Sequence, residues 1–246
     1  MQEIKNMDCF LLHGWGVTNL IWEKFSPKFN LFKNTYTPCL YDPIVKPEGT
    51  SLQSASEALS KIINNDSILI AWSISGLIAL RLLGMSSKIR AVIFIASTPC
   101  FINKDRWHNV IDTKDLEELK KKLLNNTRSS LNHFASLVAH GDTQASKTNK
   151  AVRRYLAHES NKNSLSRWLN ELETTDFRKI LASINIPCFF IFGENDILIK
   201  REIIKQVECL MPEARCITIK NCGHAPFISQ PEVTYKVISE FLNERI

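Results

Sequence analysis

The residues that could perform chemistry stand in three short stretches far apart in the sequence. They are AWSIS at 71–75, GEND at 193–196 and CGHAP at 222–226, and they contain Ser73, Asp196 and His224. Serine is a weak nucleophile at neutral pH, and it becomes reactive when a histidine takes its proton and a carboxylate orients that histidine. The sequence therefore predicts a catalytic triad of Ser73, Asp196 and His224 that attacks a carbonyl carbon.

The serine lies where a predicted strand turns directly into a predicted helix. Residues 67–72 form an isoleucine-rich apolar run, and apolar residues then recur at helical spacing up to Gly84. This arrangement is typical of a nucleophile elbow, which lifts the hydroxyl off the sheet and aims free helix N–H groups at it. The usual motif is G-x-S-x-G, and here Ala71 and Ser75 take the outer positions, which small side chains can fill.

Two of the three roles have rival residues. Ser75 could be the nucleophile, but a G-x-S-x-G motif centred on it would put Leu77 at an outer position, where a small residue is needed. Glu194 could replace Asp196 as the acid, since it lies nearer the predicted strand. Each stretch also has a structural explanation as a turn serine, a solvated or helix-capping acid, or a surface histidine. The order Ser, Asp, His, with each residue at or just after the end of a predicted strand, favours the triad.

The loop after the first predicted strand offers a site for negative charge. HGWG at 13–16 follows the apolar residues 7–12. We expect the N–H groups of Trp15 and Ile74 to form an oxyanion hole, because such donors come from this loop and from the residue after the nucleophile. The glycines would let the backbone approach the substrate closely. A tight turn without this role is the structural alternative.

The elements around these stretches alternate between strand and helix. Strands are expected at 7–12, 34–40, 67–72, 89–96, 186–192 and 215–219, and helices around Trp22 to near Pro27, at 51–63, after the elbow, near 200–210 and at 231–242. Alternation of this kind predicts an α/β fold with a mostly parallel sheet and helices on both faces. The order Ser, Asp, His is the one expected for an α/β-hydrolase fold. The carboxyl ends of parallel strands meet at one edge, where the three stretches would converge.

Residues 103–176 interrupt the alternation. They are polar and basic, with helices expected near 114–125, 128–139, 147–157 and 164–173. The sequence predicts a core of residues 1–102 and 177–246, with residues 103–176 inserted as a helical lid over the carboxyl edge of the sheet.

The net charge of +6 comes from this segment. Between Lys120 and Arg167 there are ten basic and two acidic residues, a charge of +8, so the remainder of the chain carries −2. Such an uneven distribution suggests an acidic partner for the segment.

The composition excludes several classes of protein. With 246 residues, 44% of them hydrophobic and 23% charged, the chain resembles a globular enzyme rather than a disordered protein. No run reaches the ~20 apolar residues of a membrane span, and the first residues do not resemble a signal peptide. Seven cysteines without a CxxC pair suggest reduced thiols in the cytoplasm. The histidines lack convincing metal spacing, and no glycine-rich phosphate loop is present, so no metal or cofactor is expected.

Four segments carry a closer resemblance. LLHGWG (11–16), AWSISGLIA (71–79), ASTPCF (96–101) with Trp107 after it, and GHAPFISQPE (223–232) resemble the BioH-type pimeloyl-[acyl-carrier protein] methyl ester esterases of biotin synthesis. The similarity spans nearly the whole chain and is weakest in residues 103–176. The resemblance implies a serine carboxylesterase that converts pimeloyl-acyl-carrier-protein methyl ester into pimeloyl-carrier protein and methanol.

The resemblance also implies roles for residues outside the triad. Basic lid residues of the family meet the acidic carrier protein, and the matching or neighbouring positions here are Arg128, Lys147, Lys150, Arg153 and Arg154. The acyl chain would contact Trp15, Trp72, Phe134, Leu137 and Val138. The last three share one helical face, which packing between lid helices would explain equally well.

The chain departs from the family pattern at three places. Ala71 and Ser75 replace glycines, Tyr41-Asp42-Pro43-Ile44 replaces a glycine-rich loop after the second strand, and a leading hairpin is expected to be missing or reduced. These differences affect loop shape and carrier docking, and none of them touches the triad.

Two alternatives to the carrier-specific enzyme remain. One is a general short-chain carboxylesterase or thioesterase whose basic segment is merely solvated. The other is an RNA- or phospholipid-binding face on an inactive hydrolase scaffold, which is weaker because the lysines are not interleaved with stacking aromatic residues. The expectation is a cytoplasmic monomer that acts on an acyl carrier protein, without nucleic-acid or membrane partners.

Overall fold

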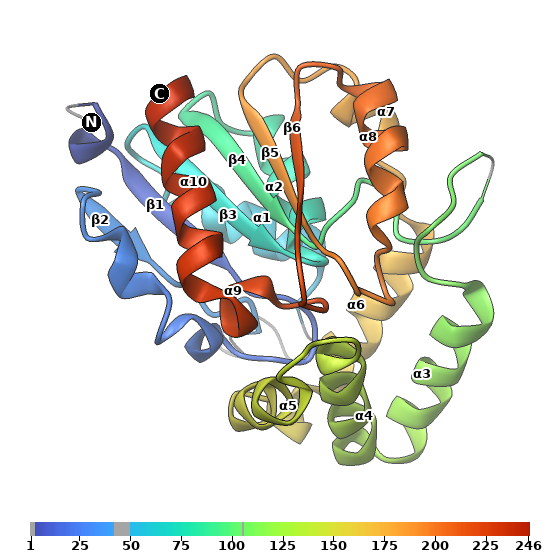
Figure 1. The fold of residues 1–246 in the computed structure, drawn as a ribbon. Helices are drawn as coiled ribbons and strands as arrows, with labels where there is room; N and C mark the ends of the chain where they lie inside the picture. The colour runs from blue at the N-terminus through green and yellow to red at the C-terminus, as the bar shows by residue number, and fades with distance from the viewer. Residues whose placement is uncertain (1–2, 42–49, 105) are drawn as a thin grey trace.

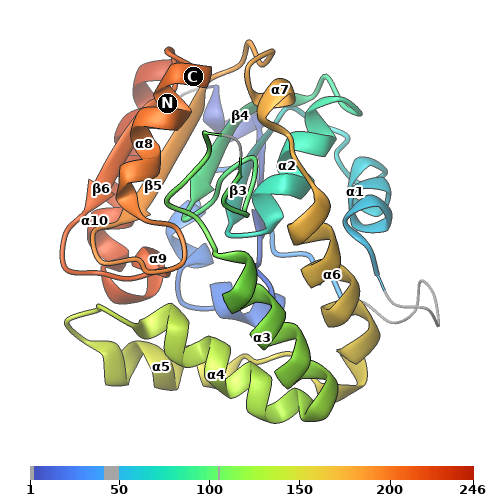
Figure 2. The same cartoon turned by 90° about the vertical axis from the view of Figure 1, so that its right-hand side faces the viewer.

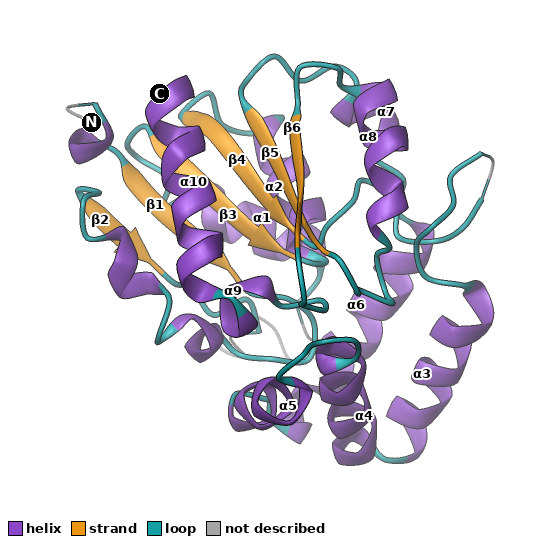
Figure 3. Cartoon of the chain, viewed as in Figure 1, coloured by secondary structure: helices purple, strands orange, loops and turns teal. Residues whose placement is uncertain are grey.

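A computed structural model describes residues 3–41, 50–104 and 106–246. These residues form a six-stranded sheet in the order β2-β1-β3-β4-β5-β6, in which all neighbouring strands are parallel (Figure 3). The strands are β1 Asp8–Leu12, β2 Asn34–Tyr36, β3 Ser67–Trp72, β4 Ile89–Ile95, β5 Cys188–Gly193 and β6 Arg215–Ile219. The prediction of an α/β fold with a parallel sheet is confirmed.

The central strands are buried on both faces, which explains their continuous apolar sequences. Every residue of β1, β3 and β5 is buried, whereas the edge strands β2 and β6 are largely part-exposed. Helices α1 (Leu52–Ser60) and α2 (Ser75–Leu83) cover one face, and α10 (Pro231–Arg245) covers the other (Figures 1 and 2). Helix α8 (Ile204–Leu210) packs beside β6.

The strand order creates a switch point between β1 and β3. From β1 the chain moves outward to β2, whereas from β3 it moves in the opposite direction to β4. In open parallel sheets a crevice forms at the carboxyl ends of the strands where the direction reverses, and ligands bind there. The HGWG loop follows β1 and the elbow follows β3, so both stretches open onto this crevice.

Four further helices lie beyond the carboxyl ends of the strands (Figure 1). They are α3 Thr113–Asn125, α4 Thr127–Ala139, α5 Ala145–Arg154 and α6 Lys162–Thr174. Helix α3 packs against α4 and α6, and α4 packs against α5. Asp112 and Asn126 cap α3 and α4 by accepting hydrogen bonds from backbone N–H groups of the first turn. The helices occupy the positions expected from the sequence.

The structure differs from the prediction in the connection between β1 and β2. Residues 19–29 form two short 3₁₀ helices, Asn19–Trp22 and Ser26–Phe29, instead of one helix that ends near Pro27. Pro27 instead lies in the first turn of the second of them, where its missing N–H costs no hydrogen bond. Strand β2 ends before Pro38, which cannot donate to a ladder, and so it is shorter than expected.

Several short elements were not predicted. They are α7 Arg178–Leu181, α9 Pro226–Ser229 and the 3₁₀ helices Ile4–Asn6 and Glu159–Asn161. The helix expected near 200–210 consists of a 3₁₀ turn, Arg201–Ile203, followed by α8. The predicted loop after Tyr41 cannot be compared, because Asp42, Pro43 and Ile44 lie outside the described residues. All seven cysteines are free, and only Cys39 and Cys209 are exposed. No helix in the described ranges is long and apolar enough to cross a membrane.

Candidate active site

Ser73 occupies the bend between β3 and α2 with a left-handed backbone, at φ 59°. Its N–H donates to Ile95 O at 2.9 Å, and its carbonyl accepts the hydroxyl of Ser97 at 2.7 Å. A side chain at Gly76 would place its Cβ 2.0 Å from Ser97 Oγ, so only glycine fits there. Contacts from the neighbouring strand β4 and the loop after it therefore hold the strained residue in place.

Ser75, the rival serine, is engaged in backbone contacts. It is completely buried, and its hydroxyl lies 2.9 Å from the carbonyl oxygens of both Leu12 and Trp72. The Ser75 hydroxyl thus joins the start of α2 to the end of β1. This contact leaves Ser73 as the serine of the elbow that faces a cavity.

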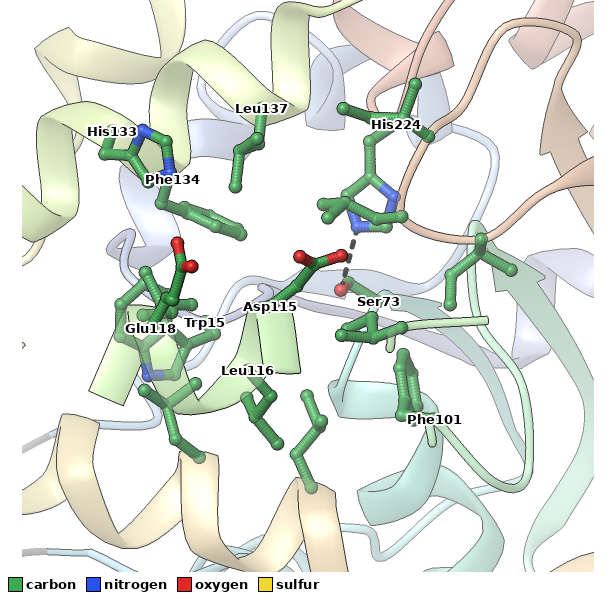
Figure 4. Close-up of a pocket in the computed structure, with 17 residues that line it drawn as sticks. Trp15, Ser73, Phe101, Asp115, Leu116, Glu118, His133, Phe134, Leu137 and His224 are labelled. Atoms are coloured by element: carbon green, nitrogen blue, oxygen red, sulfur yellow. Dashed lines mark hydrogen bonds between the residues drawn. The ribbon is translucent and has the colours of Figure 1, made fainter. Parts of the chain in front are cut away.

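The structure brings Ser73, His224 and Asp196 into one hydrogen-bonded chain. The carboxylate can only accept, so His224 Nδ1–H donates to Asp196 Oδ2, at 2.7 Å. The Nε2 atom of His224 then accepts the Ser73 hydroxyl at 2.9 Å (Figure 4). The side chains of Asp196 and His224 are almost completely buried. This tautomer leaves Nε2 free to take the serine proton.

Asp196 is itself fixed by the loop that carries it. Its Oδ1 accepts hydrogen bonds from the N–H groups of Leu198 and Ile199, at 2.9 and 3.1 Å. Glu194, the rival acid, points elsewhere, because its carboxylate binds the Arg201 guanidinium at 3.2 Å and the Asn221 N–H at 3.1 Å. Both oxygens of Asp196 are therefore committed, one to the backbone and one to the histidine.

His224 is positioned through its backbone by helix α4. Its N–H donates to Val138 O at 3.1 Å, at the end of that helix. The preceding Gly223 has no room for a side chain, since a Cβ would lie 2.5 Å from His140 O. Burial raises the pKa of Cys222 to about 12, which keeps that thiol protonated and unreactive.

Two backbone N–H groups beside Ser73 have no hydrogen-bond partner in the part of the chain that the structure describes. Among the described residues, neither the Trp15 nor the Ile74 N–H makes a hydrogen bond. A Cβ built at Gly14 would lie 3.3 Å from Ser73 Cβ and 3.0 Å from the Trp72 ring, so the loop after β1 passes directly over the elbow. Two such donors facing one serine could stabilise an oxyanion.

His13 fixes the shape of this loop. It is fully buried, accepts the Leu40 N–H at Nε2 (2.9 Å), and its Nδ1–H donates to Gly14 O at 2.9 Å. Burial lowers the pKa of His13 to about 4, so the ring is neutral at physiological pH. Gly16 has a φ of 75° and packs against the Phe134 ring, a position that favours glycine.

A cavity of about 210 Å³ opens beside the serine. Ser73 and His224 lie on its wall with mostly apolar side chains from α3, α4, α6 and the loop after β5 (Figure 4). Trp15, Phe134 and Leu137 line it, as expected, and the Trp15 and Phe134 rings meet edge to face with centroids 5.0 Å apart. The Trp15 indole N–H donates to Leu165 O of α6 at 2.9 Å.

Two expected acyl contacts are corrected by the structure. Trp72 points away from the cavity, where its indole N–H donates to His224 O at 2.8 Å and its ring packs against Phe227. Val138 is fully buried and contributes its carbonyl oxygen to the His224 loop. Successive side chains of a strand point to opposite faces of the sheet, so Trp72, the last residue of β3, points to the face opposite that of Ala71.

Several wall residues were missed from the sequence. Phe101, Leu116, Leu119, Leu169, Leu172 and the run 197–199 also line the cavity, together with Asp115, Glu118 and His133. The apolar run directly after Asp196 and the spacing of leucines on α3 were the available signals. In the described parts of the chain, no group of three or more His, Cys, Asp or Glu side chains is placed to hold a metal ion.

The five basic residues expected to meet a carrier lie outside the cavity. Lys147, Lys150, Arg153 and Arg154 are exposed on α5, and Arg128 is exposed at the start of α4. Helix α5 buries Thr148 and Val152 on its opposite side. None of the five forms an ion pair with a described carboxylate.

The family model described as "Alpha/beta hydrolase family" matches residues 9–237. The chain belongs to this family. Similar alpha/beta hydrolases include a "Pimeloyl-[acyl-carrier protein] methyl ester esterase" of Aeromonas hydrophila, 26% identical over 96% of this chain and 95% of the relative. An equally named protein of Aromatoleum aromaticum is 28% identical over 92% of this chain and 94% of the relative.

Solved structures agree on the fold. A bromoperoxidase from Bacillus anthracis superposes with a TM-score of 0.79 at 18% identity, over 97% of this chain and 92% of that one. An esterase from Exiguobacterium antarcticum gives a TM-score of 0.78 at 16% identity, over 96% of this chain and 92% of the other. At these identities the likeness establishes the alpha/beta hydrolase fold and not the reaction.

Proposed function

We propose that the protein is a serine carboxylesterase that hydrolyses the methyl ester of pimeloyl-[acyl-carrier protein] in biotin synthesis. The observation that carries the proposal is the chain of hydrogen bonds from Ser73 through His224 to Asp196, at 2.9 and 2.7 Å, opening onto an apolar cavity. The similarity to pimeloyl-[acyl-carrier protein] methyl ester esterases over nearly the whole chain supports this choice of ester.

The geometry suits acyl transfer through a covalent intermediate. His224 Nε2 takes the hydroxyl proton as Ser73 Oγ attacks the ester carbonyl, and Asp196 stabilises the imidazolium that forms. The Trp15 and Ile74 N–H groups hold the oxyanion, and the imidazolium then protonates the departing methanol. Water repeats the sequence on the acyl-enzyme and releases the acid. No step requires a metal ion or an organic cofactor.

The cavity and the basic helix α5 suit the two ends of such a substrate. The cavity of about 210 Å³, walled by Trp15, Phe134 and Leu137, is large enough for a short acyl chain. The cations of α5 and Arg128 of α4 are exposed, and both helices lie beyond the carboxyl ends of the strands (Figure 2). We infer that residues 103–176 act as a lid and that its basic surface holds an acidic carrier protein in the cytoplasm.

Labelling with a fluorophosphonate probe tests the reaction class. The probe should modify wild-type protein at Ser73 and leave Ser73→Ala unlabelled, whereas a binding module on an inactive scaffold would not react. Complementation of a biotin-requiring strain that lacks the methyl esterase tests the pathway, and Ser73→Ala should abolish rescue.

A general short-chain carboxylesterase or thioesterase is the second candidate, because the fold and the triad geometry suit it equally. Comparing carrier-bound methyl ester with free methyl esters separates the two. If the carrier is recognised, reversing charge at Lys150 and Arg153 should lower kcat/KM for the carrier-bound ester only. Added salt should weaken the same reaction, since it screens the attraction between exposed charges. Equal effects on both esters would support the general esterase.

A further inference from the structure

Two acidic side chains lie in the otherwise apolar wall of the cavity. Asp115 and Glu118 stand three residues apart on α3, a spacing that puts them on one helical face, and both line the cavity with Leu116 and Leu119. Figure 4 shows the Asp115 carboxylate directed toward Ser73 and His224, and the Glu118 carboxylate farther along the cavity, beside Phe134 and His133. Both residues are also exposed, so they lie where the cavity meets solvent.

Neither carboxylate is neutralised by a described neighbour. Asp115 and Glu118 form no ion pair with a described basic side chain. Lys122, on the same helix, has its Nζ 3.4 Å from His133 Nε2. Burial and the Lys122 charge lower the pKa of His133, and this favours the neutral ring although Glu118 acts against the shift. The cavity mouth is therefore negative.

The rest of the helix shows that this placement is specific to the two residues. Helix α3 has the sequence TKDLEELKKKLLN, and its other acid, Glu117, is exposed but does not line the cavity. A merely solvated helix face would explain Glu117. It does not explain why Asp115 and Glu118, and not Glu117, line the cavity together with Phe134 and Leu119.

We propose that Asp115 and Glu118 act as an electrostatic filter that admits acyl chains with uncharged ends and rejects chains that carry a carboxylate. This inference rests on the proposed esterase function and specifies its substrate class. The ester and its uncharged acyl chain pass the two acids, whereas the carboxylate formed by hydrolysis is repelled by them. The filter thus favours release of the acid product and opposes its return.

The size of the effect follows from the charges. We consider one carboxylate of the filter and one carboxylate of the substrate. At a separation of about 7 Å and an effective dielectric constant of roughly 40, for a cavity open to water, their repulsion energy corresponds to a factor of about seven in kcat/KM. Removing both carboxylates should therefore reduce the discrimination by at least about tenfold. Salt should reduce it as well, because the Debye length is about 10 Å at 0.1 M.

The test compares dimethyl pimelate, which is uncharged, with monomethyl pimelate, which carries one carboxylate. We expect the wild-type chain to prefer the dimethyl ester, and the preference in kcat/KM to fall by at least about tenfold in Asp115→Asn/Glu118→Gln. Glu117→Gln is the matched control on the same helix and should keep the wild-type ratio. Inhibition by pimelate should strengthen only in the double variant.

The outcomes separate this inference from the proposed function. If the wild-type chain hydrolyses dimethyl pimelate but the ratio of the two esters is the same in the double variant, the filter is wrong and the esterase remains. If neither the free esters nor the carrier-bound methyl ester is hydrolysed, the esterase proposal fails. The filter is then tested by ligand-observed NMR on Ser73→Ala, with and without the two substitutions. Equal binding of dimethyl pimelate and pimelate to Ser73→Ala would overturn it.

Discussion

Replacing Asp196 by asparagine tests the triad most directly, because it exchanges one carboxylate oxygen for an NH₂ group of similar size and so preserves the packing. In the native chain Oδ1 accepts from two backbone N–H groups at 2.9 and 3.1 Å, and Oδ2 accepts from His224 Nδ1 at 2.7 Å. Asparagine offers one acceptor oxygen and one donor NH₂ at these two places. The two backbone donors select the oxygen, so the NH₂ group must face His224 Nδ1.

This orientation reverses the histidine tautomer. Nδ1 must then accept, the ring proton moves to Nε2, and Nε2 can no longer take the proton of Ser73, which lies 2.9 Å away. In serine hydrolases the equivalent change lowers kcat by about 10⁴, and we expect a loss of that order. The free energy of unfolding should change by less than about 1 kcal/mol, because all these hydrogen bonds keep a partner. Asp196→Ala should instead destabilise the fold, since it leaves the buried N–H of Ile199 and the part-buried N–H of Leu198 unpaired.

Hydrolysis of p-nitrophenyl butyrate, with thermal unfolding followed by circular dichroism, measures both quantities. Glu194→Gln is the matched control, because its carboxylate binds Arg201 and the Asn221 N–H and should affect activity less than about threefold. The reasoning is refuted if Asp196→Asn keeps more than about a tenth of wild-type activity. A loss of similar size in Glu194→Gln would show that the acid was assigned wrongly.

Three further perturbations test the surroundings of the triad. Gly223→Ala should lower kcat and the melting temperature together, because its Cβ would lie 2.5 Å from His140 O and displace His224; unchanged kinetics would contradict this. Gly16→Ala should cost about 1–2 kcal/mol of stability, measured by urea unfolding, since its φ is 75°. The pKa of His13 is lowered to about 4 in the folded chain. The unfolded chain therefore protonates this histidine below pH 6.5, whereas the folded chain protonates it only near pH 4. Stability should therefore fall by about 3 kcal/mol as the pH drops through this window, and His13→Gln should remove that slope.

The sheet was predictable because its strands are buried on both faces. A strand such as β5, CFFIFG, is a continuous apolar run, which is typical of a strand buried on both faces. Once strands and helices are placed along the chain, few sheet topologies are possible. The connection between β1 and β2 was misread because Trp22 and Phe25 have apolar spacing but pack in an aromatic cluster with Phe227, which comes from the distant end of the chain. Such tertiary contacts leave no local signal.

The same limit applies to the candidate site. Ser73, Asp196 and His224 could be selected because each follows a recognisable strand, so position along the chain implied position in space. The acids of the cavity could not be selected in this way. Asp115 and Glu118 belong to a helix with four lysines and three acids, which is the usual pattern of a solvated face. Only the packing of α3 against α4 and α6 turns that face toward Ser73.

Helix α4 and the turn after it accept hydrogen bonds from the loop that carries His224 and from the loop that carries Asp196, and these bonds restrict where a substrate can enter. Val138 O holds the backbone of His224, and the Asn195 side chain donates to Gly141 O at 2.7 Å, next to the acid. Moving α4 would therefore disturb the base and the acid at once. Helix α3 has no comparable bond to a triad loop among the described residues and packs mainly on α4 and α6. An acyl chain that entered beside α3 would leave the hydrogen bonds to His224 intact, and it would pass Asp115 and Glu118 on its way to the serine.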